Sequence, residues 1–237
     1  MISSNFSLSL YFLSFSFLLL IDADEAYGFD TPPPIQARCL APILAGQRNI
    51  YVRADAGIDR ASAVAIAALS RIDTSQDTTQ AIVLTTTREC AMALYQIFKN
   101  LNSSQNAAKL GVTYGGMPIR SLLQELKEST PHVVIGTFGR VRALIERGAL
   151  SMDGVTMLAM DDVEEALSRG FDEYLEFYFE RMQQRIADGR VQRIAFSELI
   201  SEALIAFVDK HLVSQTNDKL DELVCVATES CRQSIIC

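Results

Sequence analysis

The sequence predicts a single α/β domain in which helices cover both faces of a parallel sheet. From Ile35 onward, short apolar runs alternate with amphipathic runs. This alternation is typical of β-α-β units, whose right-handed crossovers bring the carboxyl ends of the strands to one edge of the sheet. Polar and glycine-containing strings follow the predicted strands, and ligands of open α/β sheets bind at that edge. The pattern therefore predicts a nucleotide-binding fold.

The strands are predicted where short apolar runs are bounded by polar residues or turn signals. They cover residues 49–52, 80–84, 109–114, 132–135, 155–160 and 191–195. The first helix follows three prolines and ends at Gly46, and the others have apolar residues every three or four positions. The helices cover residues 35–46, 61–72, 88–101, 118–127, 139–147, 171–186 and 199–211. Residues 220–226 are compatible with a short strand or a helix.

The composition limits what the domain binds. A net charge of −8 argues against strong non-specific binding to nucleic acid, so any such contact must come from a local patch. The five cysteines form no C-x-x-C pair, which favours reduced thiols over a disulfide framework. With only two histidines, a zinc site is not expected.

Residues 1–25 form an extension rich in Ser, Phe and Leu, and residues 2–20 carry no charge. Three interpretations stay open. The segment is an artefact, such as a translated intron tract, or a disordered extension. It is a membrane-targeting segment, although no Lys or Arg precedes the apolar run. Or it is a packed helix.

Six short strings lie in or just after the predicted strand-to-helix loops. They are GFDTPPPIQ at 28–36, ADAGIDRA at 54–61, TTTREC at 85–90, GG at 115–116, GTFGR at 136–140 and DDVE at 161–164. Their order and spacing resemble the first, RecA-like P-loop domain of a DEAD-box ATP-dependent RNA helicase, closest to the initiation factor 4A branch. The resemblance covers residues 26–212. Residues 213–237 are then a tail, and the second helicase domain is expected to be absent.

The resemblance implies ATP and magnesium as cofactors, with the phosphates held by Ala54, Gly57 and Arg60. The string departs from the family pattern at three neighbouring positions. Asp59 stands at the second glycine, Arg60 at the lysine, and Ala61 at the threonine whose hydroxyl holds magnesium. ATP binding is therefore expected to be weak or lost. The alternative interpretation is an ordinary strand-to-helix turn.

DDVE resembles the motif that binds magnesium and the attacking water. Asp161 is then the magnesium ligand, and Asp162 replaces a glutamate that is one methylene longer, so both are relic catalytic residues. The family's Ser-Ala-Thr motif reads Phe-Ser-Glu at 196–198. Without a bound cation, Asp161, Asp162, Glu164 and Glu198 are expected to raise one another's pKa. The alternative is a solvated helix start.

GFDTPPPIQ resembles the adenine-reading motif, with Phe29 as an anchor and Gln36 reading the adenine edge through its amide. The alternative is that both residues only hold a loop to a helix.

TTTREC, GG and GTFGR resemble the strings that grip the RNA sugar-phosphate backbone, and they are better kept than the ATP strings. The residues implied to bind single-stranded RNA are Thr87, Arg88, Gly115, Gly116, Thr137, Gly139 and Arg140. Hydroxyls, arginines and helix N-termini suit phosphate without reading bases. Alternatively, Arg88 and Arg140 are helix-start surface residues that pair with local acids.

The leading hypothesis is a degenerate helicase domain without ATPase activity, located in the cytoplasm. It is expected to bind RNA weakly or to bind translation-initiation scaffold proteins, unless it is a gene fragment under no functional demand. The alternative is an active ATP-dependent RNA helicase of translation initiation. A third hypothesis is a decoy that occupies partners of the full-length factor. Membrane contact is expected only if residues 2–20 are a real anchor.

Overall fold

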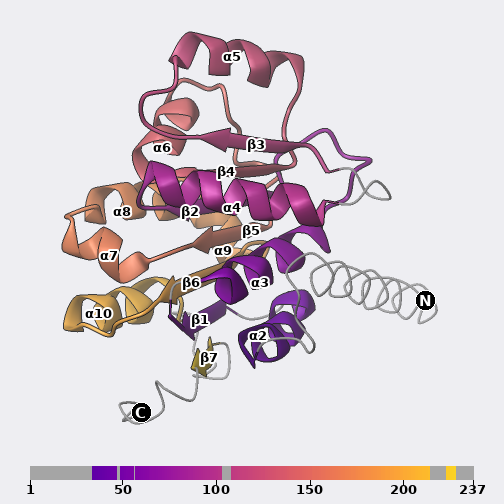
Figure 1. Cartoon of the computed structure of the whole chain (residues 1–237). Coiled ribbons are helices and arrows are strands. Elements are labelled where there is room, and N and C mark those ends of the chain that lie inside the picture. The colour runs from indigo at the N-terminus through magenta and orange to yellow at the C-terminus, as the bar shows by residue number, and fades with distance from the viewer. Residues whose placement is uncertain (1–33, 47–48, 56, 103–107, 214–222, 228–237) are drawn as a thin grey trace.

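The computed structural model describes residues 34–46, 49–55, 57–102, 108–213 and 223–227. They form one seven-stranded sheet of strand order β3-β4-β2-β5-β6-β1-β7, and the strand pairings are parallel (Figure 1). The strands are β1 (Asn49–Arg53), β2 (Ala81–Thr85), β3 (Leu110–Thr113), β4 (Val133–Thr137), β5 (Met157–Met160), β6 (Gln192–Ser197) and β7 (Leu223–Ala227). The predicted parallel α/β fold is confirmed.

Helices cover both faces of this sheet. On one face, α2 (Pro34–Ala45), α3 (Ile58–Leu69) and α4 (Arg88–Leu101) pack on alternate strand residues. The other face is covered by the remaining helices, which share a second buried cluster with the strands. They include α5 (Ile119–Glu128), α6 (Phe138–Glu146), α7 (Val163–Ser168), α8 (Asp172–Arg181) and α10 (Glu202–His211), while α9 (Gln183–Ala187) follows α8.

Strand β2 shows how the chain supplies both cores. Ala81 and Val83 belong to the cluster under α2, α3 and α4, whereas Ile82 and Leu84 belong to the opposite cluster. All five residues of the strand are buried, as expected for a parallel strand covered on both faces. This explains why the strand is a continuous apolar run in the sequence.

The structure corrects several predicted boundaries. The single helix predicted at residues 171–186 is wrong, because the chain forms α8 and α9 with an interruption at the fully buried Met182. The last predicted helix begins at Glu202 rather than at 199, with the Ser201 hydroxyl accepting a hydrogen bond from the Leu204 N–H at 3.2 Å. Residues 223–227 form the strand β7 beside β1, which decides between the two options left open there.

Residues 1–33 lie outside the described ranges, and with them the apolar extension and Phe29. Among the described residues, no helix is long and apolar enough to cross a bilayer.

Candidate functional site

The strand order divides the carboxyl edge of the sheet into two halves. The strands β3, β4 and β2 are consecutive neighbours, and the strings implied to bind RNA follow these three strands. The strands β5, β6 and β1 form the other half, and the strings implied to bind ATP and magnesium follow them. The arrowheads in Figure 1 point toward this edge, on the left of the view.

Arg60 lies at the centre of the ATP half. Its Nε atom is 3.0 Å from Oδ1 of Asp161, and its Nη2 donates to Oδ1 of Asp162 at 2.6 Å. Its Nη1 donates to the main-chain carbonyl of Ala54 at 3.0 Å. Arg60 is 3% exposed, so this guanidinium is enclosed by the protein. Arg60, which stands where the family pattern has a lysine, therefore contacts carboxylates of the chain itself.

Asp162, which pairs with Arg60, has an unusual backbone conformation. Asp162 precedes α7 with a left-handed backbone, φ 54° and ψ 52°, which aspartate adopts more readily than most residues. Its side chain does not cap the helix, so the carboxylate is available for the ion pair. Burial raises the pKa of Asp161 to about 6, because desolvation and the neighbouring Asp162 charge outweigh the attraction of Arg60. The sequence predicted a rise from mutual repulsion of acidic side chains, whereas for Asp161 burial is the main cause and the Asp162 charge a smaller one.

The described part of the phosphate-loop string leads directly into α3. Gly57 has an extended backbone, φ 171°, and a Cβ placed there would meet no atom within 4 Å. Its carbonyl accepts the Ala61 N–H at 3.1 Å, which begins α3. Asp59 adds a carboxylate in the first turn of that helix, where the family has glycine. Asp59 and the enclosed Arg60 thus stand where the resemblance expects a glycine and a phosphate-binding lysine.

The side-chain amide of Gln36 has a hydrogen-bond partner for its nitrogen but none for its oxygen among the described residues. It is fully buried on α2, and its Nε2 donates to the Ser62 hydroxyl on α3 at 2.6 Å. Its Oε1 has no partner among the described residues. An acceptor in this state fits an amino group such as that of adenine.

Two residues of the string at 196–198 are part of the protein interior. Phe196 and Ser197 are fully buried. The Ser197 hydroxyl lies 2.8 Å from the Tyr51 hydroxyl and donates to the Leu199 carbonyl at 2.8 Å. This places Ser197 in the packing between β6 and β1.

The RNA half contains a groove of about 280 Å³. Residues of all three RNA strings line it, together with two aromatic residues from the start of α8. The lining residues are Thr86, Arg88, Gly115, Thr137, Phe138, Gly139, Phe171 and Tyr174. The structure thus brings Arg88, Gly115, Thr137 and Gly139 together as predicted.

Three of the predicted RNA residues have other contacts. The Thr87 hydroxyl accepts the Cys90 N–H at 3.1 Å and caps α4. Arg140 donates from Nε to the Tyr114 carbonyl at 3.0 Å and therefore braces the turn that carries Gly115 and Gly116. Gly116 has a positive φ of 97° within that turn, a conformation that glycine adopts without strain, so its role is to form the turn. Arg88 is exposed, with its guanidinium 5.1 Å from the centre of the Tyr114 ring.

The sequence strings did not include Tyr174. It lies in α8, and its ring is 5.5 Å from that of Phe171. A Cβ on Gly139 would come within 3.2 Å of the Tyr174 ring, so the glycine allows this close packing. The aromatic spacing of Phe171, Tyr174 and Tyr178, three and four residues apart, is the signal that points to a shared helix face.

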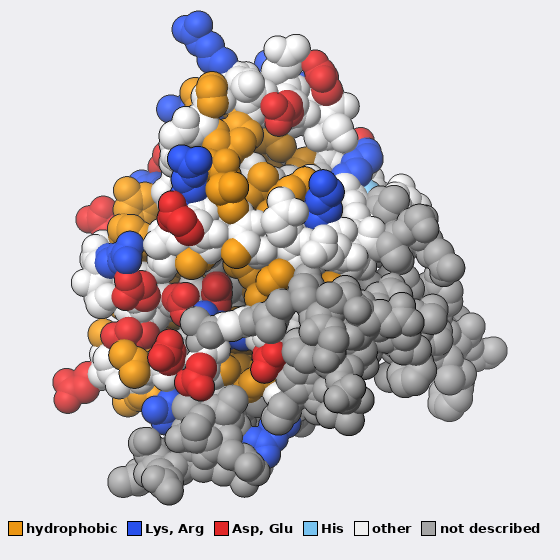
Figure 2. Space-filling model, in the orientation of Figure 1, with side chains coloured by type: hydrophobic (Ala, Val, Ile, Leu, Met, Phe, Trp, Pro, Cys, Tyr) orange, Lys and Arg blue, Asp and Glu red, His pale blue; other side chains and the backbone are white. Residues whose placement is uncertain are grey.

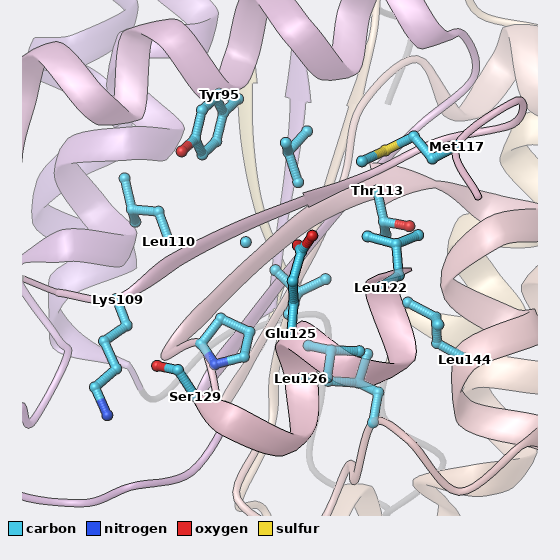
Figure 3. A pocket seen from close by; sticks show the side chains of 15 residues that line it. Tyr95, Lys109, Leu110, Thr113, Met117, Leu122, Glu125, Leu126, Ser129 and Leu144 are labelled. Atoms are coloured by element: carbon cyan, nitrogen blue, oxygen red, sulfur yellow. The ribbon is translucent and has the colours of Figure 1, made fainter. Parts of the chain in front are cut away.

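A second hollow of about 280 Å³ lies between α5 and the edge strand β3 (Figure 3). Its lining is mostly apolar, including Leu110, Leu126 and Met117, with Glu125 on the α5 side. Leu122 is the buried residue of α5, so this helix packs on the sheet with a gap beneath it. Among the described residues, no cluster of three His, Cys, Asp or Glu side chains could hold a metal ion.

Comparisons with known proteins agree with this architecture. The DEAD/DEAH box helicase family model matches residues 33–198. The ATP-dependent RNA helicase eIF4A of Encephalitozoon cuniculi is 35% identical over 195 residues, which are 82% of this chain and 44% of that protein. The eIF4A of Schizosaccharomyces pombe is 37% identical over 155 residues, which are 65% of this chain and 39% of that protein. The chain thus spans less than half of these relatives.

Solved structures show the same fold at low sequence identity. A DEAD box protein from Methanococcus jannaschii superimposes with a TM-score of 0.73 at 23% identity, covering 88% of this chain and 53% of that one. Dbp5 of Saccharomyces cerevisiae, bound to Nup159, Gle1, IP6 and ADP, gives a TM-score of 0.74 at 18% identity, covering 89% of this chain and 52% of that one. From the matched motifs, the sheet and the family model together, the chain belongs to the DEAD/DEAH box helicase family.

Proposed function

We propose that this chain is a helicase-family domain that binds single-stranded RNA weakly and does not hydrolyse ATP. The observation that carries the proposal is the contrast between the two halves of the carboxyl edge. In the RNA half, residues of three strings line an open groove. In the ATP half, Arg60, Asp161 and Asp162 are engaged with one another. We place its action in the cytoplasm, in line with the eIF4A resemblance.

The absence of hydrolysis follows from separate losses in the phosphoryl-transfer apparatus. Ala61 has no hydroxyl for magnesium, and Asp59 sets a negative charge beside the phosphates. Asp162 is paired with Arg60 and is shorter than the family's glutamate, so it is poorly placed to orient water. Because a misplacement near 1 Å costs about 100-fold in rate, these changes together are expected to abolish turnover.

The groove offers contacts that suit the RNA backbone. Arg88 supplies an exposed positive charge. Thr137 lines the groove, and a hydroxyl suits a phosphate oxygen. The rings of Phe171 and Tyr174 line the same groove, and base stacking on aromatic rings is largely indifferent to sequence. We therefore expect binding without base specificity.

Surface charge limits the affinity. Figure 2 shows acidic side chains gathered over the lower left of the molecule, in the region of α7, α8 and α10. Exposed acids there include Asp172, Glu173 and Glu202. These carboxylates repel RNA phosphate, and the net charge of the chain is −8. Affinities in the micromolar to millimolar range are expected, and a translation-initiation scaffold protein is the other partner class that the family suggests.

A second candidate is an ATP-dependent RNA helicase acting in translation initiation together with another chain. The free Oε1 of Gln36 favours it, because this atom suits the adenine amino group. The eIF4A relatives are ATP-dependent RNA helicases by name.

An ATPase assay with and without single-stranded RNA separates the two candidates. The proposed function predicts no phosphate release above background in either condition. RNA-stimulated turnover of even about 0.1 per second, well below typical enzyme rates, would favour the active helicase. Fluorescence anisotropy with a labelled single-stranded RNA at low salt tests the binding itself. Nanomolar binding at physiological salt would contradict the weak-binding proposal.

A further inference from the structure

We infer that Arg60 is a built-in cation that holds Asp161 and Asp162 together and thereby keeps a divalent metal ion out of the site. The inference rests on the proposed function, since it gives a physical cause for the loss of nucleotide chemistry in the same place. It also makes a separate claim, which is that the oxygen atoms suited to a metal ion are still present and only blocked.

The contacts of Arg60 are those of a cation among oxygen ligands. Each of its three guanidinium nitrogens meets a different oxygen, from Asp161, Asp162 and the carbonyl of Ala54. Carboxylate and carbonyl oxygens are also the ligands preferred by hard divalent ions such as Mg²⁺, Ca²⁺ and Mn²⁺. The oxygens come from the residues that directly follow β1 and β5 and from the residue that precedes α7. Main-chain hydrogen bonds from the Ala54 N–H to the Ser197 carbonyl and from the Asp161 N–H to the Leu84 carbonyl anchor two of these residues without Arg60.

A swinging arginine that makes way for a ligand would be expected at the surface. Arg60 is instead enclosed, and its partners Asp161 and Asp162 have side chains only 13% and 21% exposed. Burying a guanidinium is costly unless it is paired. If Arg60 moved away from Asp161 and Asp162 but stayed buried, it would lose this pairing, so such a movement is unfavourable. Arginine also reaches three oxygens in fixed directions, whereas lysine is a single compact charge. The replacement of lysine by arginine thus explains why the cluster closes on itself.

Charge balance predicts what happens when Arg60 is removed. Two carboxylates face one guanidinium, so the ionised cluster already carries an excess negative charge. Replacing Arg60 by alanine leaves both carboxylates and the Ala54 carbonyl around vacated space. That arrangement attracts a small divalent ion. The variant Arg60→Ala is therefore expected to gain a metal site that the natural chain does not offer.

Titration with Mn²⁺, followed by electron paramagnetic resonance of the free ion, tests this gain. The full chain is expected to take up Mn²⁺ only with the weak background of surface acids, whereas Arg60→Ala binds one ion at least about tenfold more tightly. The double variant Arg60→Ala/Asp161→Asn is expected to return to background. Arg169→Ala, which frees Glu165 from an exposed ion pair, is the matched control and is expected to gain nothing.

Circular dichroism must show that each variant is folded. If Arg60→Ala is unfolded without metal and folds with Mn²⁺, the inference is supported. If it stays unfolded, Arg60→Gln, which keeps much of the side-chain volume, decides by the same titration. Equal Mn²⁺ binding by the natural chain and the folded variant, or no gain in either variant, would overturn the inference. ATP turnover by the natural chain would instead contradict the proposed function, so the two failures are distinguishable.

Discussion

The guanidinium of Arg140 donates from Nη2 to the main-chain carbonyl of Met117 at 2.6 Å. A second bond, from Nε to the Tyr114 carbonyl at 3.0 Å, makes Arg140 span the turn between them. This residue stands where the sequence suggested an RNA-binding arginine. In this chain, its hydrogen bonds hold the glycine turn beside the groove, and Arg88 is the exposed cation of the same groove.

Arg140→Ala is expected to lower the free energy of unfolding by about 1–2 kcal/mol, because two carbonyls lose charged donors at a half-buried site. Urea denaturation followed by circular dichroism measures the change. Arg169→Ala is the control, since it removes only an exposed pair with Glu165 and should cost less than about 0.5 kcal/mol. Equal effects of the two substitutions would contradict the bracing role of Arg140.

Arg88→Ala is expected to weaken RNA binding and leave stability nearly unchanged, because the side chain is exposed and touches mainly the Tyr114 ring. If it contacts one phosphate, the slope of log K against log salt should become shallower by about 0.7. Anisotropy titrations at several KCl concentrations measure the slope. An unchanged slope would place the RNA outside this groove.

Gly136→Ala is expected to destabilise the fold strongly. A Cβ at this position would lie 2.4 Å from the Thr113 carbonyl oxygen and 2.8 Å from Cγ2 of Val141, within the pairing of β3 and β4. Overpacking of this kind costs about 1–3 kcal/mol, and here part of the obstacle is backbone. Gly57→Ala is the control, because its Cβ would meet nothing within 4 Å. Thermal unfolding should show a clearly lower Tm for Gly136→Ala than for Gly57→Ala.

Most of the fold could be predicted from the sequence because its signals are local. The buried strand β2 is an uninterrupted apolar run, and α4 has Ala91, Leu94 and Phe98 on one face at helical spacing. The interruption between α8 and α9 could not be predicted, since Met182 is neither glycine nor proline and no turn signal surrounds it.

The site was less predictable because its decisive contacts are long-range. Arg60 meets Asp162 across 102 positions of sequence, and Arg140 meets Tyr114 across 26. A motif gives the residue type at each position, but it does not say whether a cation faces a ligand, a carboxylate or a carbonyl. The sequence therefore indicated which residues gather at the edge of the sheet, and the structure showed how they pair.

The last prediction concerns pH and the buried His211. Its ring stacks on Phe179 with centroids 4.1 Å apart, and its Nε2 lies 3.0 Å from Glu176. Burial lowers the pKa of His211 below 6.5, although the Glu176 charge opposes this. The pKa of Glu176 is also lowered, because its bond to Lys210 and the His211 charge outweigh its burial.

Both shifts have the same sign for stability. A histidine with a lowered folded-state pKa stabilises the fold above pH 6.5, and that contribution is lost as pH falls toward the folded-state pKa. A glutamate with a lowered pKa likewise loses its contribution on acidification. Between the His211 pKa of the unfolded state and that of the folded state, the free energy of unfolding falls by up to about 1.4 kcal/mol per pH unit.

His211→Phe keeps an aromatic ring beside Phe179, and its free energy of unfolding should decline less steeply between pH 7 and pH 5. Urea unfolding at a series of pH values measures both slopes, and the other histidine, His132, cancels because it is present in both proteins. Parallel curves would show that His211 does not titrate with folding.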